Sequence, residues 1–256
     1  MAMQPAPVPN TPANPAAATR PGGATGKAEA LGRFIVVFGT KGGVGKTVVA
    51  TNMAASLAQR TRKPVCLVDM DMIAVGDVCK MLGINATRSI VDLMPVLRRA
   101  AQSLPDPSDP ASAANDGPPA AANGAGLVLH TPIPLESHIT PHVSGVHVMT
   151  AISNPKQINQ MDSKVLPLLF HALKKRYEYV IVDGGKTFYE PLIAAFDAAN
   201  LILLVASPDV ITLYQTKWAL GLVESLLFPS SMVKAILNRA DSRGGVETRD
   251  VRAAIP

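Results

Sequence analysis

The segment of residues 39–47 is rich in glycine and ends in Gly-Lys-Thr, the ending of the phosphate-binding loop pattern G-x-x-x-x-G-K-[ST]. We interpret Gly39 as the first glycine of this pattern and Gly45 as the second. Gly42, Gly43 and Gly45 would let the backbone curl so that its N–H groups converge on phosphate oxygens. The helix expected after the loop would add the partial positive charge of its N-terminus. The segment therefore predicts a phosphate site.

Two side chains at the end of this loop have the chemistry that a Mg²⁺-bound nucleotide requires. The Lys46 ammonium would reach the β- and γ-phosphates, and the Thr47 hydroxyl would bind Mg²⁺. The residues of this segment predicted to bind the nucleotide are Gly42, Gly43, Val44, Gly45, Lys46, Thr47 and Val48.

Three carboxylates follow apolar runs that are typical of strands. Asp69 and Asp71 follow the run at residues 65–68, and the alternation of side chains along a strand would put both on one side. Asp183 follows the run at residues 179–182, an arrangement typical of the acid that holds the water shell of Mg²⁺ in proteins with a phosphate-binding loop. We therefore expect these acids to face the nucleotide and its metal.

These residues need a sheet that brings the ends of several strands together. Nearly continuous apolar runs indicate strands buried on both faces, and they alternate with helical patterns. We predict strands at residues 34–38, 65–68, 146–149, 179–182, 201–206 and 232–237, and helices at 47–60, 77–82, 165–175 and 213–227. The apolar side of the first helix is expected to carry Val48, Ala55, Leu57 and Ala58. The predicted fold class is α/β, a mostly parallel central sheet with helices on both faces, and ligands bind beyond the carboxyl ends of such strands.

Composition limits the classes of protein that remain. The 256 residues are 48% hydrophobic and 17% charged, which rules out a wholly disordered chain. Only 4% are aromatic, which argues against base stacking, while a net charge of +5 permits nucleic acid or anionic lipid as a partner. A content of only two cysteines favours a reducing compartment. No apolar run is long enough for a membrane helix, and the first residues lack the pattern of a signal peptide. We therefore expect a cytoplasmic protein without a transmembrane segment.

The string KGGVGKT at residues 41–47 resembles the deviant Walker A motif of the MinD/ParA superfamily of P-loop ATPases. The resemblance implies that ATP is the nucleotide and that Lys41 reaches across an ATP-sandwich homodimer to the partner's nucleotide. It also implies that Asp71 positions the attacking water and that Asp69 supports Mg²⁺ or the loop. The predicted catalytic residues are Lys41, Lys46 and Asp71, and the predicted metal site is Thr47, Asp69 and Asp183.

Further positions take their roles from the same resemblance. Asn238 follows the last predicted strand, where family members have an asparagine that contacts adenine, and the neighbouring Arg239 is included in the predicted nucleotide site. The alternative for Asn238 is an Asx turn. Gly76-Asp77 matches a switch I sequence of some members, and the alternative for Asp77 is a helix N-cap.

The resemblance is strongest to the TadZ/CpaE pilus-assembly branch, over residues 68–83, 138–151 and 180–217. It implies a slow ATPase that dimerises with ATP and positions or assembles a Flp/type IV pilus or a related secretion machine. Recruitment to the inner membrane or the cell pole would then depend on a partner protein.

Two alternatives to this function remain. One is a ParA-like partition ATPase that binds DNA non-specifically, since arginines follow the last predicted strand. The other is a nucleotide-binding scaffold that does not hydrolyse ATP, since Gly184-Gly185-Lys186 stands where family members commonly have a proline soon after the acid.

The predicted domain organisation follows from composition and from the resemblance. Residues 1–32 lack apolar periodicity, and we expect a disordered Pro/Ala-rich arm. Residues 33–256 would form the P-loop ATPase domain, with a low-complexity insertion at about 104–126. Because family members usually continue with another strand and helix, we expect this domain to be truncated at its C-terminal end.

Overall fold

The computed structural model describes residues 31–73, 76–104, 132–242 and 245–255 of the 256-residue chain. Its strands are β1 (Arg33–Phe38), β2 (Val65–Asp69), β3 (Thr140–Pro141), β4 (Val146–Thr150), β5 (Tyr179–Asp183), β6 (Leu201–Ala206) and β7 (Val233–Leu237). In this part of the chain they form one sheet in the order β3-β4-β2-β5-β1-β6-β7. Every neighbouring pair is parallel except β3 and β4, which confirms the predicted mostly parallel sheet.

The central strands are buried on both faces because their side chains alternate between two apolar cores. In β1, Phe34, Val36 and Phe38 enter one core, and Ile35 and Val37 enter the other. Such strands need helices on each side of the sheet.

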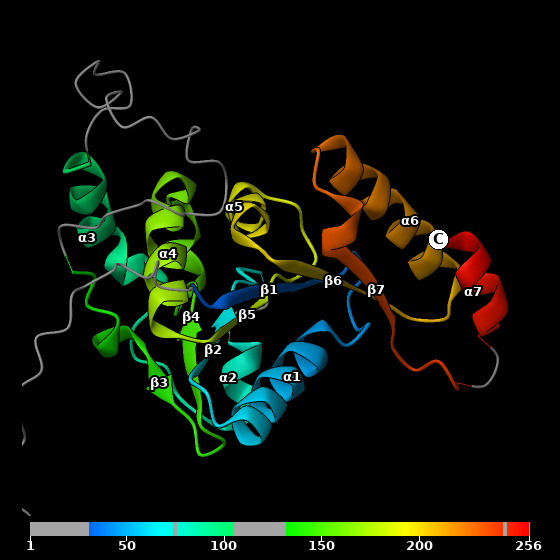
Figure 1. Ribbon diagram of the computed structural model, residues 1–256, viewed down its shortest axis with the longest axis horizontal. Helices are drawn as coiled ribbons and strands as arrows, with labels where there is room; N and C mark the ends of the chain where they lie inside the picture. The colour runs from blue at the N-terminus through cyan, green and yellow to red at the C-terminus, as the bar shows by residue number, and fades with distance from the viewer. Residues whose placement is uncertain (1–30, 74–75, 105–131, 243–244, 256) are drawn as a thin grey trace, which may run out of the picture.

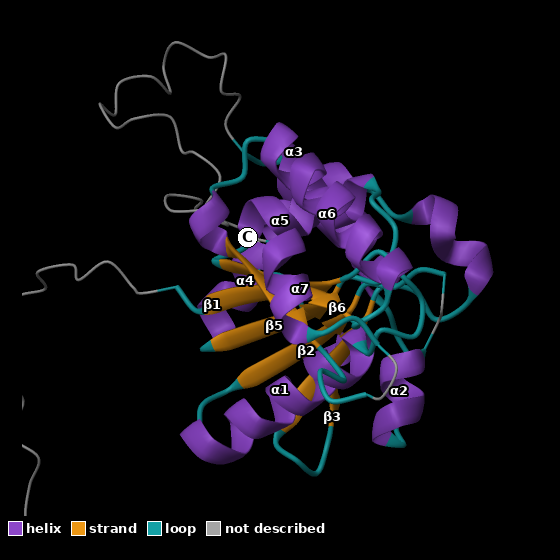
Figure 2. Ribbon diagram, turned by 90° about the vertical axis from the view of Figure 1, so that its right-hand side faces the viewer, coloured by secondary structure: helices purple, strands orange, loops and turns teal. Residues whose placement is uncertain are grey.

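Helices cover both faces as predicted (Figure 1, Figure 2). They are α1 (Lys46–Thr61), α2 (Asp77–Leu82), α3 (Ile90–Gln102), α4 (Leu166–Arg176), α5 (Glu190–Ala198), α6 (Val210–Ser225) and α7 (Thr248–Ala254). Helices α3, α4, α5 and α6 contribute to one core, and α1 and α2 contribute to the other. Helix α7 packs on α6 through a small cluster of Leu213, Val251 and Ile255.

The side of α1 that faces the sheet is lined by small residues. Ala50, Ala54 and Ala58 are buried at a spacing of four residues, which lets the helix lie close to the strands. The predicted apolar side was wrong at Val48, whose side chain is 48% exposed. Ala58 was predicted correctly and Leu57 packs at the edge of the core, but the buried Ala50 and Ala54 were missed.

Helices α3, α5 and α7 and the short strand β3 are absent from the predicted set. Helix α3 starts with a capping box in which Ser89 and Asp92 bond to each other's backbone, and it contains Pro95. A proline within a helical pattern argues against the helix, which obscured it. Helix α5 begins with Glu190 and has Pro191 in its first turn, where proline is tolerated.

Some expectations lie beyond what the structure can address. The predicted arm at residues 1–32 and the predicted insertion at 104–126 lie outside the described residues, apart from residues 31, 32 and 104. Over the described ranges, none of the helices combines the length and the hydropathy needed to span a bilayer.

Candidate nucleotide site at the carboxyl edge of the sheet

The glycine-rich loop joins β1 to α1 at the edge where the parallel strands end. Gly43 and Gly45 have φ angles of 77° and 97°, the left-handed region that glycine adopts without strain. Gly42 does not adopt this conformation, so it is not required for the curl in the predicted way. Gly45 is the N-cap of α1 and offers no side-chain cap, which leaves the first N–H groups of the helix available to an anion.

The spacing of this loop corrects one sequence interpretation. Five residues separate Gly39 from Gly45, so Thr40, not Gly39, occupies the position of the first glycine in the general pattern. A glycine is needed at position 39 for a different reason, because a Cβ there would lie 2.6 Å from the carbonyl oxygen of Val205. It allows β1 to end close to β6.

Lys46 is folded back over the loop. Its side chain is buried, and its Nζ donates a hydrogen bond of 2.9 Å to the carbonyl oxygen of Lys41. Burial lowers the pKa of Lys46, while the carboxylates of Asp183 and Asp71 oppose that effect. A cation is thus held at the place where phosphate would sit.

Asp69 and Asp183 are paired neighbours at the ends of β2 and β5. Both are almost fully buried, and Oδ2 of Asp69 and Oδ1 of Asp183 have no hydrogen-bond partner among the described residues. Burial, with a contribution from Asp183, raises the pKa of Asp69 to about 8. Burial also raises the pKa of Asp183, against hydrogen bonds from the Thr47 hydroxyl and the Gly185 amide. Two buried acids with orphaned oxygens favour a cation beside them.

These groups fit a Mg²⁺ ion that is shared with phosphate. Within the described ranges, no group of three or more His, Cys, Asp and Glu side chains could hold a metal alone. The Thr47 hydroxyl and the Asp183 carboxylate supply hard oxygen atoms, the donors that Mg²⁺ prefers, and phosphate oxygens and water would complete the octahedron.

Asp71 lies between the loops that follow β2 and β5. Its Oδ1 accepts a hydrogen bond of 2.9 Å from the Ile73 N–H. Gly185 packs against it with a φ of 68°, and a Cβ at that glycine would lie 2.8 Å from Cγ of Asp71. The structure thus brings Asp69, Asp71 and Asp183 to one edge, as the sequence predicted.

The Lys41 side chain forms an ion pair with a residue of its own chain, Asp209. Its Nζ lies 2.9 Å from Oδ1 of Asp209, and both side chains are more than a third exposed. Asp209 is the N-cap of α6 and also accepts hydrogen bonds from Thr212 and Ser207. Partial burial opposes ionisation of Asp209, but the bonds from Thr212, Lys41 and Ser207 outweigh it and hold the pKa well below its ordinary value. The sequence analysis missed Asp209, although its position after β6 follows the same rule that found the other acids.

Asn238 braces the phosphate loop. Its Nδ2 donates to the carbonyl oxygen of Val44 at 2.8 Å, and a Cβ on Gly45 would lie 2.3 Å from that nitrogen. Its Oδ1 accepts from the N–H of the next residue, Arg239, at 3.0 Å, whereas an Asx turn would bond the N–H two residues on. Arg239 has a left-handed φ of 57° and lines a pocket of about 560 Å³ with residues at the ends of β6 and β7.

The remaining predicted position, Asp77, is the first residue of α2. The N-cap is Gly76, with a φ of 81°, and no side chain caps the helix. Asp77 therefore lies in the first turn, where its charge complements the helix dipole, and the N-cap alternative was off by one residue.

Known proteins resemble this chain over most of its length. Residues 35–252 match the CobQ/CobB/MinD/ParA nucleotide binding domain family. The septum site-determining protein MinD of Thermotoga maritima is 24% identical over 82% of this chain, which spans 65% of that protein's length. The chromosome partitioning protein ParA of Myxococcus xanthus is 28% identical over 84% of this chain and 68% of its own length.

Solved structures share the fold at low identity. A ParA family ATPase from Chlorobium tepidum superposes with a TM-score of 0.69 at 20% identity, over 88% of this chain and 81% of that one. MinD from Pyrococcus horikoshii, complexed with Mg-ADP, gives a TM-score of 0.62 at 18% identity, over 88% and 77%. Since the family match covers most of the residues that build this site, the chain belongs to the CobQ/CobB/MinD/ParA nucleotide binding domain family.

Proposed function

We propose that this chain binds Mg²⁺-ATP at the carboxyl edge of its sheet and hydrolyses it slowly. The observation that carries the proposal is a buried lysine on a glycine-rich loop beside two buried acids with orphaned oxygens. A Mg²⁺-triphosphate would supply both the anion for the lysine and the cation for the acids. In support, MinD from P. horikoshii was solved with Mg-ADP, and a cobyrinic acid a,c-diamide synthase from Mycobacterium smegmatis was solved with an ATP analogue and magnesium.

The residues of the site would bind the phosphates, the metal, the attacking water and the base separately. The N–H groups of the loop bind the phosphates, and Lys46 exchanges the Lys41 carbonyl for β- and γ-phosphate oxygens. Thr47 and Asp183 hold Mg²⁺, whose charge offsets that of the phosphates. Asp71 orients the attacking water, and Asp69 supports the metal's water shell. The adenine would occupy the pocket lined by Arg239, next to Asn238.

The proposed output is a switch between a monomer and an ATP-bound homodimer. In this structure Lys41 is bound to Asp209 of its own chain, so it must leave that ion pair to reach a partner's nucleotide. An exposed ion pair contributes little free energy, so ATP and a second copy can displace it. Because ATP and ADP would favour different states, hydrolysis resets the switch.

We infer from the sequence resemblance to the TadZ/CpaE branch that the switch positions or assembles a Flp/type IV pilus or a related secretion machine. A partner protein would recruit it from the cytoplasm to the inner membrane or the cell pole. The TadZ/CpaE resemblance alone supports this finer assignment.

A partition role is the second candidate, because one relative is the M. xanthus partitioning protein. Non-specific DNA binding would need exposed arginines near the last strand. Arg239 meets this need, but Arg249 is bonded to Glu247 at 3.0 Å and lies near Asp250. If DNA is the partner, Arg239→Ala weakens ATP-dependent binding with a steep salt dependence, and salt-independent duplex affinity would remove this candidate.

The test of the main proposal compares ATP turnover and solution mass. Asp71→Ala should keep ATP bound, block phosphate release, and give a dimer with Mg²⁺-ATP and a monomer with Mg²⁺-ADP by light scattering. Lys41→Ala in the same background should remain monomeric. Full turnover by Asp71→Ala would show that another group positions the water, and one mass with both nucleotides would overturn the dimer switch.

A further inference from the structure

Tyr189 links the loop after β5 to the loop that carries Asp71. It is the N-cap residue of α5, and its hydroxyl donates a hydrogen bond to the carbonyl oxygen of Met70. Met70 stands between Asp69 and Asp71 and is fully buried. No sequence motif singles out this tyrosine, since it acts through its position in space.

The backbone around Met70 is bonded at each polar group. Its N–H donates to the carbonyl oxygen of Asp183 at 2.9 Å, and its carbonyl oxygen accepts from Tyr189. The next N–H, that of Asp71, donates to Oδ1 of Asp69 at 3.2 Å. The peptide unit that joins Met70 to Asp71 is therefore fixed at both its oxygen and its nitrogen. That plane sets the direction in which Asp71 leaves the backbone.

The Asp71 carboxylate is confined from the opposite side as well. Gly185 leaves no room for a Cβ beside it, and the Ile73 N–H holds one of its oxygens. The Tyr189 hydroxyl is protonated at neutral pH, as any tyrosine is, and is therefore a donor; burial, with Asp71 close by, raises its pKa further above the ordinary value.

We propose that Tyr189 is a positioning residue for ATP hydrolysis: by holding the Met70 carbonyl, it keeps the Asp71 carboxylate aimed at the attacking water. The inference rests on the proposed hydrolytic function. Tyr189 lies on the chain segment that follows Asp183, so it also keeps the spacing between the metal-binding and water-positioning acids. Removing the hydroxyl would leave the loop folded but would hold that peptide only through the Asp71 N–H.

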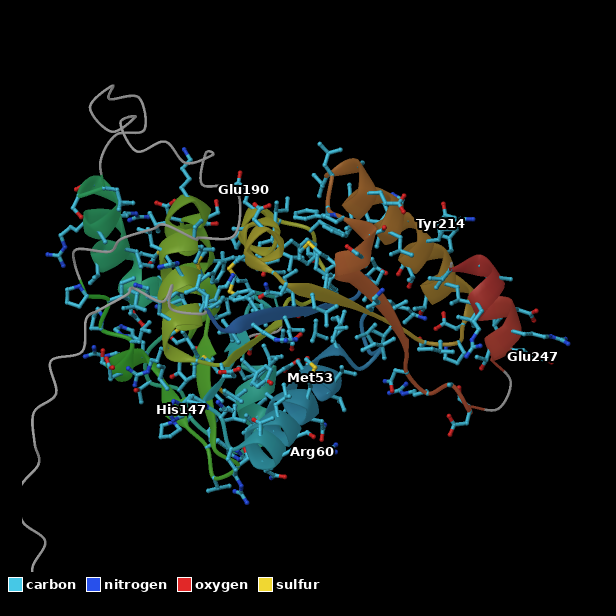
Figure 3. All side chains as sticks on the ribbon, viewed as in Figure 1. Met53, Arg60, His147, Glu190, Tyr214 and Glu247 are labelled. Atoms are coloured by element: carbon cyan, nitrogen blue, oxygen red, sulfur yellow. The ribbon has the colours of Figure 1, made fainter. Side chains whose placement is uncertain are left out.

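The test is Tyr189→Phe, which deletes one oxygen atom. The matched control is Tyr177→Phe: its hydroxyl bonds to Nδ1 of His147 at 2.9 Å, and Figure 3 shows His147 at the opposite side of the molecule from α6. We expect Tyr189→Phe to lower kcat about tenfold while KM and the affinity for a fluorescent ATP analogue stay within twofold, because one buried hydrogen bond is lost. The control should keep the wild-type kcat.

A second readout separates this proposal from the hydrolytic one. In the nucleotide-free protein, hydrogen exchange of the segment at residues 69–73 should be faster in Tyr189→Phe and unchanged in the control. Wild-type exchange in Tyr189→Phe overturns the proposed positioning even where no turnover is found, whereas a wild-type chain that binds ATP without hydrolysing it overturns the hydrolytic function. If Tyr189→Phe fails to fold, Gly185→Ala is the second variant, because its methyl group crowds Asp71 from the other side. This variant should lower kcat and retain the affinity for ATP. An unchanged kcat in Gly185→Ala refutes the proposal that the aim of the Asp71 carboxylate controls hydrolysis.

Discussion

We predict that the buried acid at the end of β2, Asp69, makes the nucleotide-free protein less stable as pH rises. Burial and Asp183 raise the pKa of Asp69 from 3.8 to about 8, so the folded state binds a proton that the unfolded state releases. The free energy of unfolding is therefore highest below about pH 4, where Asp69 is protonated in both states, and it falls between about pH 4 and pH 8. At about 1.4 kcal/mol per pKa unit, the full shift corresponds to about 6 kcal/mol, shared with Asp183 because the two acids titrate as a pair.

Asp69→Asn removes this penalty because the amide stays neutral. We expect the variant to exceed the wild type by about 2–3 kcal/mol at pH 8, or about 4–12 °C in Tm for a domain of this size, and to differ little at pH 4. The assay is thermal unfolding of the nucleotide-free protein from pH 4 to pH 9. Glu178→Gln, an exposed acid just before β5, is the control and should follow the wild type. If Asp69→Asn shows the same pH dependence as the wild type, the buried pair does not carry this charge penalty.

Two other predictions concern nucleotide binding. Lys46→Ala should reduce the affinity for ATP at least a hundredfold, because the loop loses its buried cation. Lys63 is an exposed lysine before β2, so the control Lys63→Ala should bind ATP normally in the same titration. Equal affinity of the two variants would refute the phosphate-site assignment. The single tryptophan, Trp218, is 57% exposed and packs edge-on against Phe188, with the ring centroids 5.9 Å apart. Its fluorescence should therefore change when nucleotide reorders the loop after Asp183, and Phe188→Leu should weaken that change. Constant emission at saturating Mg²⁺-ATP would show that this loop does not respond to nucleotide.

The fold and much of the site could be predicted because their signals are local. Continuous apolar runs marked the parallel strands, and the polar residue after each run marked the site. Asp69, Asp71 and Asp183 meet because the strands that precede them are parallel and adjacent, and the register pairs Asp69 with Asp183. Here a rule about sheets was sufficient to bring distant residues together.

The parts that could not be predicted depend on contacts between segments that are far apart in the sequence. Tyr189 reaches Met70 across 119 residues, and Asn238 reaches the Val44 carbonyl across 194. No periodicity encodes such bonds. The Lys41–Asp209 ion pair is of the same kind, since the motif identified the lysine but only the structure shows the acid that binds it.

The charges of the site argue that metal and nucleotide bind as one unit in the proposed function. Lys46 faces the carboxylates of Asp183 and Asp71, which already offset its positive charge before any phosphate arrives. A triphosphate alone would therefore meet repulsion from these two carboxylates in the proposed site. A Mg²⁺ ion alone would find too few ligands, because no set of three acids is arranged to hold it among the described residues. Each ligand supplies what the other lacks, and the buried acids thereby make the nucleotide-free site selective for the Mg²⁺-bound form.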